Sequence, residues 1–228
     1  TLDGSHFAKG DTVVCVVTPT DGESQGASMT APSVLILDTP PSVATVTLTP
    51  DSGNTLTEFT CAAEGLSDQD EGDEVDLQYI WLLNGEELPG TTSTTSAGIA
   101  LQRDDTLQCK VLPLSGDVEG AAVESEEVTI GNAAPDGGAV VMGPVPATEL
   151  SGITCVSNGA SDPDGDNIAL EYHWYVNGEL IEGVLGSTLG GAHYDKGDTV
   201  LCEVVAFDGE LWSAPVASKV AIAVQNSP

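Results

Sequence analysis

The chain has 228 residues, long enough for one or two domains, and its 40% hydrophobic content is enough to build packed cores. Acidic residues number 36 against five Lys and Arg, which gives a formal net charge of −31 at pH 7. This charge repels nucleic acid and anionic membranes, because both are bound mainly through Lys and Arg, and it suits cation binding. No apolar run approaches the roughly 20 residues of a membrane-spanning helix.

The first 15 residues reappear near the end of the chain. The segment TLDGSHFAKGDTVVC (1–15) matches TLGGAHYDKGDTVLC (188–202) at a constant offset of 187. A more divergent copy lies between them and aligns Cys15 with Cys109 at an offset of 94. The larger offset therefore contains two repeats, of 94 and 93 residues, and a fixed period of this kind indicates an array of similar domains.

The repeat divides the chain into three segments. We predict the C-terminal half of one repeat at 1–41, a complete repeat at 42–134 and a further complete repeat at 135–228. The boundaries fall in short segments that contain Pro, which ends strands and stiffens linkers. Such linkers favour a rod of domains in tandem over a compact pair around one cleft.

Short β-rich runs broken by Gly, Pro, Asn and Asp predict an all-β fold for each repeat. In LQYIWLLNG (77–85) every second residue is apolar, which places one face of a strand in the core, and the final Asn-Gly predicts a two-residue hairpin turn. The segment LEYHWYVNG (170–178) has the same pattern. The runs at 197–207 and 218–224 are predicted to form later strands.

Each complete repeat also holds two cysteines with a Trp between them. Cys61 and Cys109 are 48 residues apart, and Cys155 and Cys202 are 47 apart. The order Cys, Trp, Cys at these spacings resembles the core of the immunoglobulin fold. The string SDPDGD followed by Y-x-W-x-x-N-G further resembles the bacterial immunoglobulin-like and PKD-like tandem repeats of large secreted and cell-surface proteins.

The resemblance implies tandem immunoglobulin-like β-sandwiches, each with a disulfide between its two sheets. The implied pairs are Cys61 with Cys109 and Cys155 with Cys202, each with a Trp packed on it. Disulfides indicate an oxidising compartment, and therefore a secreted or cell-surface location.

Two features depart from a closed antibody-type domain. Leu107 and Val200 take the place of the Tyr that lies two residues before the second Cys in antibody domains. Cys15 is unpaired within the chain, and its repeat predicts a partner about 48 residues upstream. We therefore expect the natural polypeptide to extend upstream; the alternative is that another chain completes the half repeat.

The acidic stretch SDPDGD at 161–166 is a candidate calcium site. Calcium takes six to eight oxygen ligands, often from closely spaced carboxylates in a turn. The candidate ligands are Asp162, Asp164 and Asp166 here, and Asp68, Asp70 and Asp73 in the related stretch SDQDEGD at 67–73. Glu71 is inserted in the latter, so the former is predicted to bind calcium better. The alternative is a plain acidic turn between strands, which Asp, Pro and Gly favour.

Catalytic signatures such as the G-x-S-x-G elbow, the P-loop and the dinucleotide-binding motif do not occur in the sequence. We therefore predict no enzyme, but a structural or adhesive repeat segment of a large extracellular surface or fibre protein, stiffened by calcium. Its expected partners are copies of itself in a filament, paired through edge strands, or a cell-surface ligand, with no nucleic acid and no direct membrane insertion. The alternatives are a glycan- or protein-binding module and an accessory region of a secreted enzyme.

Overall fold

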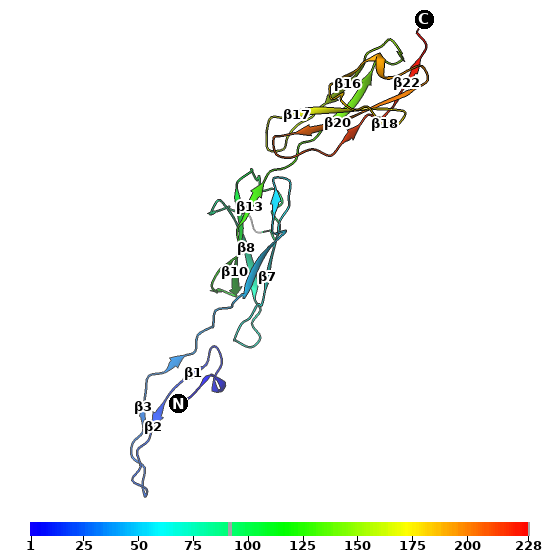
Figure 1. The fold of residues 1–228 in the computed structure, drawn as a ribbon. Helices are drawn as coiled ribbons and strands as arrows, with labels where there is room; N and C mark the ends of the chain where they lie inside the picture. Colours follow the sequence, from blue (N-terminus) through cyan, green and yellow to red (C-terminus); the bar gives the residue numbers. More distant parts are fainter. Residues whose placement is uncertain (91–92, 228) are drawn as a thin grey trace. The chain divides into compact units, whose positions relative to one another are not determined.

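The computed structural model describes residues 1–90 and 93–227, which form an all-β structure with two 3-10 turns (Figure 1). Pro228, the last residue of the predicted third segment, lies outside this range. Residues cluster into two compact units: the first holds 1–51, 58–98 and 106–128, and the second holds 52–57, 99–105 and 129–228. In the described part of the chain, no helix has the length and apolar character needed to cross a membrane.

The N-terminal segment forms only two short strand pairs. After the turn η1 (Gly4–His6), β1 (Thr12–Val13) pairs antiparallel with β4 (Val34–Leu35), and β2 (Val16–Val17) pairs antiparallel with β3 (Met29–Thr30). Residues 1–40 are all described, and none of them is buried.

The same segment carries apolar side chains that are buried in a complete repeat. Val17 is 61% exposed, whereas Val204, at the equivalent position 187 residues later, is fully buried. Cys15 is exposed and free, whereas its equivalent Cys202 is buried and disulfide-bonded. The two short strand pairs of the N-terminal segment do not cover these side chains.

The middle repeat has two sheets. The smaller one pairs β5 (Thr45–Thr49) with β7 (Thr60–Glu64). The larger one has the order β6-β13-β10-β8-β9, with β11 and β12 also paired to β10. Its strands are β6 (Gly53–Asn54), β8 (Asp76–Leu83), β9 (Glu86–Glu87), β10 (Thr106–Ser115), β11 (Val118–Glu119), β12 (Val123–Glu124) and β13 (Val128–Gly131).

The third repeat forms the more complete sandwich. One sheet has the order β14-β16-β19, and the other has the order β15-β22-β20-β17-β18 with β21 paired to β20. The strands are β14 (Ala139–Gly143), β15 (Ala147–Thr148), β16 (Ile153–Asn158), β17 (Ala169–Val176), β18 (Glu179–Leu180), β19 (Thr188–Leu189), β20 (Thr199–Phe207), β21 (Val216–Ala217) and β22 (Ile222–Gln225). The turn η2 (Gly191–His193) precedes β20.

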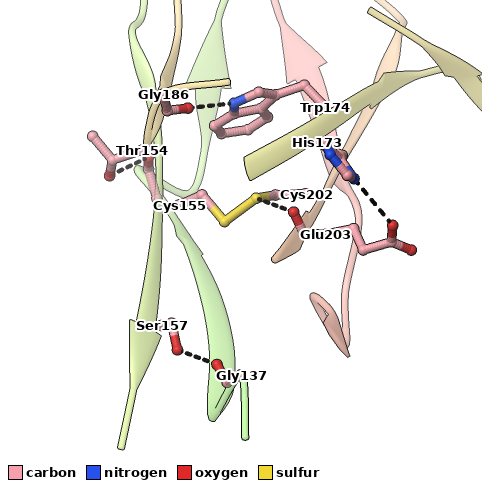
Figure 2. The surroundings of a disulfide bond; sticks show 10 residues. Gly137, Thr154, Cys155, Ser157, His173, Trp174, Gly186, Cys202 and Glu203 are labelled. Atoms are coloured by element: carbon pink, nitrogen blue, oxygen red, sulfur yellow. Dashed lines mark hydrogen bonds and ion pairs between the residues drawn. A yellow bond between two sulfur atoms is a disulfide. The ribbon is translucent and has the colours of Figure 1, made fainter. Parts of the chain in front are cut away.

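A disulfide joins the two sheets of the third repeat. Cys155 on β16 is bonded to Cys202 on β20, with the two Cα atoms 6.4 Å apart (Figure 2). Trp174 on β17 is fully buried in the same core cluster, and its indole N–H donates to the carbonyl of Gly186 at 2.9 Å. The largest side chain of this core therefore buries its apolar surface and still satisfies its one polar atom.

The middle repeat has the same core. Cys61 on β7 is bonded to Cys109 on β10, with the Cα atoms 6.1 Å apart. Trp81 on β8 is fully buried, and its indole N–H donates to the carbonyl of Ser93 at 2.9 Å. The prediction of tandem immunoglobulin-like sandwiches, each with an inter-sheet disulfide, is confirmed.

The Asn-Gly turns fix the register of the Trp-bearing strands. Asn84 and Asn177 have φ values of 53° and 54°, and the glycines that follow them have φ values of 78° and 86°. Positive φ at both central residues defines the type I′ hairpin turn, which Asn-Gly adopts with little strain. These turns hold Trp81 and Trp174 on the inner face of their strands.

The disulfide of the third repeat generates a stability prediction. Replacing Cys155 and Cys202 together by Ala should lower the free energy of unfolding of this repeat by about 2–5 kcal/mol, because the unfolded chain regains the freedom of an open loop. Guanidinium unfolding followed by Trp fluorescence measures the change. Cys15→Ala is the control and should leave the midpoint unchanged, since this thiol is exposed and free. Equal midpoints for the double variant and the parent would contradict the prediction.

Candidate functional site

Two acidic loops precede the Trp-bearing strands. The first acidic loop (67–73) leads into β8, and the second acidic loop (161–166) leads into β17. Each loop starts with an antiparallel bridge to the beginning of its own repeat, Ser67 to Ser42 and Ser161 to Asp136. The sandwich therefore fixes where each loop begins.

The first Asp of each loop folds the loop into a turn. One carboxylate oxygen of Asp68 accepts a hydrogen bond from the backbone N–H of Asp70 at 2.9 Å. The corresponding oxygen of Asp162 accepts from the backbone N–H groups of Asp164 and Asp166, at 2.8 and 3.2 Å. These are Asx-type turns, so the predicted acidic-turn geometry is present in both loops.

The second Asp of each loop binds the backbone of the linker before its repeat. Asp70 Oδ2 accepts from the backbone N–H of Thr39, and Asp164 Oδ2 accepts from that of Ala133, both at 2.7 Å. Thr39 and Ala133 are equivalent at the offset of 94. Hydrogen bonds of this length to a carboxylate are stronger than those between neutral groups. The Thr39 N–H is also the main cause that holds the pKa of Asp70 below its ordinary value.

Asp164 has a further partner. The hydroxyl of Thr55 donates to its Oδ1 at 2.7 Å, so both carboxylate oxygens of Asp164 accept a hydrogen bond. Thr55, Ala133 and Asp164 all belong to the second compact unit. A buried backbone N–H and a hydroxyl therefore depend on one carboxylate.

A lysine forms ion pairs at the first acidic loop. Lys9 Nζ lies 2.8 Å from Asp73 Oδ2 and 2.7 Å from Asp38 Oδ2, and all three residues belong to the first compact unit. The hydrogen bond to Asp38, followed by that to Asp73, raises the pKa of the Lys9 ammonium. We name Lys9, Asp38 and Asp73 the first ionic clasp.

An arginine plays the same part at the second acidic loop. Arg103 Nη1 lies 3.1 Å from Asp166 Oδ2, and Arg103 Nη2 forms an ion pair with Glu210. These residues belong to the second compact unit, and we name them the second ionic clasp. The hydrogen bond to Glu210 is the main cause that raises the pKa of Arg103. Because Arg103 is the repeat equivalent of Lys9, the two clasps are built on one pattern.

The clasps were only partly predictable. Of the six predicted calcium ligands, only Asp70 and Asp73 belong to a group whose oxygens lie within 4.8 Å of one another, and the third member is Asp38. Within 1–90 and 93–227, the other four predicted ligands form no such group. Asp38 lies in the linker, outside both loops, so the loop motif does not point to it. The repeat aligns Asp38 with Asn132, and both have a side-chain oxygen shortly before a linker Pro. This alignment is the sequence signal that points to Asp38.

Four side-chain oxygens near the loops are buried without a hydrogen-bond partner among the described residues. They are Asp38 Oδ1 and Asp68 Oδ2 at the first loop, and Asn132 Oδ1 and Asp162 Oδ2 at the second. The offset of 94 relates both pairs. Buried polar oxygens are normally paired, so these four oxygens at equivalent positions are the ones open to a further polar partner.

Comparisons with known proteins concern the fold alone. No protein-family model and no curated protein matches the chain. The three N-terminal domains of the Highly Immunogenic Outer Capsid protein of bacteriophage RB49 are 15% identical, with 97% of this chain and 96% of that chain covered and a TM-score of 0.36. The Ca2+-stabilized adhesin of an Antarctic bacterium is 17% identical, with 95% and 57% covered and a TM-score of 0.35.

A two-domain fibronectin type III segment of chicken tenascin is also similar, at 9% identity, with 82% and 99% covered and a TM-score of 0.34. Similar solved structures thus include tandem fibronectin type III and related β-sandwich domains, bacterial ones among them. The resemblance to PKD-like repeats stays a prediction.

The bond between Asp164 and the linker backbone generates a second prediction. Asp164→Ala should lower the free energy of unfolding by about 1–3 kcal/mol, because it leaves the buried N–H of Ala133 without its acceptor. Amide hydrogen exchange at Ala133 should also become faster. Asp117→Ala removes an equal charge from an exposed turn and serves as the control. Unchanged exchange at Ala133 would show that the bond does not protect the linker.

Proposed function

We propose that the chain is a non-catalytic structural or adhesive repeat segment of a large extracellular protein. The observation that carries this proposal is that both acidic loops make the same kinds of contact. In both compact units the loop binds a linker N–H and a basic side chain, at equivalent positions. An arrangement repeated along the chain suits a load-bearing or spacing role better than a single active centre.

The use of the carboxylates also supports a structural role. Asp164 and Asp70 accept from linker backbone, and Asp73 and Asp166 pair with basic side chains. Carboxylates in such hydrogen bonds and ion pairs stabilise the contact between loop and linker. General acid or base catalysis needs a carboxyl group free to exchange a proton with a substrate.

The two disulfides support a secreted or cell-surface location. Both have the loop lengths expected of inter-sheet bonds, at sequence separations of 48 and 47. Such bonds persist in oxidising compartments and are rare where thiols are kept reduced. The acidic composition fits the same setting, because a net charge far from zero keeps a long surface protein soluble.

We further propose that calcium binds at both acidic loops and stiffens them. The buried, unpartnered oxygens of Asp68 and Asp38 at one loop, and of Asp162 and Asn132 at the other, are hard ligands of the type calcium prefers. At the first loop Asp38 lies at the position that the neutral Asn132 takes at the second, and Asp38 Oδ2 is paired with Lys9.

The calcium proposal predicts a change in melting temperature. Adding calcium to the chelated chain should raise Tm, and Asp68→Asn or Asp162→Asn should weaken binding at its own loop by roughly tenfold or more. These substitutions keep the Oδ1 acceptor of the turn and replace the unpartnered carboxylate oxygen by an amide. Calorimetric titration measures both sites, with Asp117→Asn as the charge-matched control. Identical melting curves with calcium and with chelator would remove the proposal.

A second candidate function, a binding module, is favoured by a hollow of about 340 Å³ in the third repeat. Its lining includes Val140, Met142, Val145, Pro146 and Ile222, so it suits an apolar group of a protein partner better than a polar glycan. Val145 is 76% exposed at its rim.

The structural proposal predicts how the chain behaves in solution. Small-angle scattering should give the profile of a rod, because linkers with Pro hold consecutive repeats apart. A glycan array should retain none of the protein. A compact scattering profile, or specific retention on the array, would contradict the structural reading and support the binding module.

A further inference from the structure

The basic residues of this chain are few and regularly placed. Only five Lys and Arg occur among 228 residues. Three of them, Lys9, Arg103 and Lys196, occupy one repeat position, in the turns that lead into β1, β10 and β20. In a chain with a net charge of −31, a basic residue at this position in every repeat indicates that a positive charge is needed there.

Two of these three residues hold an acidic loop, and the third does not. Lys9 and Arg103 are the cations of the first and second ionic clasps. Lys196 is exposed, and no ion pair involves it within the described residues. Lys196 therefore has the positive charge with which Lys9 and Arg103 bind an acidic loop, but it binds no acidic loop itself.

The linker position of the clasp also recurs near the end of the chain. The backbone N–H groups of Ile36, Ile130 and Val224 donate to equivalent carbonyls, those of Asp11, Asp105 and Asp198. Counting three residues onward from each donor reaches Thr39, Ala133 and Ser227. Thr39 and Ala133 are the residues whose N–H groups bind the acidic loops, so Ser227 is the third member of that series.

A glutamate of the third repeat binds Ser227 in place of an acidic loop. The Ser227 hydroxyl donates to Glu149 Oε1 at 2.9 Å. Glu149 follows β15, just as Thr55 follows β6, and these two strands pair in the same parallel manner with β22 and β13. Where Thr55 donates to the carboxylate of Asp164, Glu149 supplies a carboxylate of its own.

We propose that Lys196, Glu149 and Ser227 form a half clasp that binds the acidic loop of a further repeat of the same kind, joined in tandem. The tandem arrangement follows from the spacing of the existing clasps, in which the paired Asp lies 64 residues after Lys9 and 63 residues after Arg103. The incoming loop presents a carboxylate to Lys196 and another to the Ser227 N–H.

Glu149 makes the half clasp self-capped. Its carboxylate accepts a hydrogen bond from the Ser227 hydroxyl when no acidic loop is bound, beside the N–H that an incoming Asp would bind. The same negative charge repels the incoming loop at short range. Glu149 therefore weakens the contact relative to the second ionic clasp, where the equivalent residue is the neutral Thr55.

The test uses the full chain extended by a second copy of residues 135–228, studied in chelator so that calcium plays no part. Lys196→Ala should lower the unfolding midpoint of the appended repeat. Asp166→Ala in the appended copy should have little further effect once Lys196 is gone, because the two side chains act as a pair. Lys219→Ala removes a basic residue outside the series and is the matched control.

Glu149→Thr is the informative second variant, because it installs the residue type that the second clasp carries at this place. It should raise the midpoint of the appended repeat and enlarge the effect of Lys196→Ala. Moderate salt should reduce both effects, because exposed charges are screened over about 10 Å at 0.1 M ionic strength. The proposal would be overturned if Lys196→Ala and the appended Asp166→Ala had additive effects both in the parent and in the Glu149→Thr variant.

The inference rests on the proposed structural role of the clasps, so the natural pair is tested beside it. In the unextended chain, Arg103→Ala and Asp166→Ala should be non-additive in the same assay. Loss of coupling in this pair would count against the proposed function itself. Coupling here, combined with additivity at Lys196, would overturn only the half clasp.

Discussion

The bond between the two sheets of each sandwich is the constraint on which the other features depend. Aromatic residues make up only 4% of the chain, so each core relies mainly on aliphatic side chains, with one Trp, one further buried aromatic residue (Phe59 or Tyr194) and the disulfide. The second Cys of each pair also sets the position of the clasp. Lys9, Arg103 and Lys196 each lie six residues before that Cys or its equivalent, so the strand that carries the covalent bond also positions the cation.

The fold could be predicted from the sequence because its determinants are local or strictly spaced. Asn84-Gly85 and Asn177-Gly178 specify their hairpins through backbone preference alone. The cysteine spacing, with a Trp between, depends on a covalent geometry that few folds satisfy. The half repeat at 1–41 stays a prediction from the same alignment, and Val17 in it is exposed.

The partners of the acidic loops could not be predicted in the same way. Asp73 and Asp166 meet cations more than 60 residues away, and Asp70 and Asp164 bind backbone N–H groups, which carry no side-chain signal in a sequence. An acidic turn is present in both loops, and the later aspartates bind linker N–H groups and basic side chains. Asp68 and Asp162 shape the turn, and this frees the later carboxylates to reach outward.

The hydrogen bond from the linker to each acidic loop also restricts where proline can stand. Thr39 and Ala133 must keep a backbone N–H, which proline lacks. The linker prolines follow this rule, because Pro40, Pro41 and Pro135 all lie after the donor. In each linker the residue that binds the acidic loop therefore comes first, and the proline that stiffens the chain follows it. This order gives each linker a direction along the polypeptide.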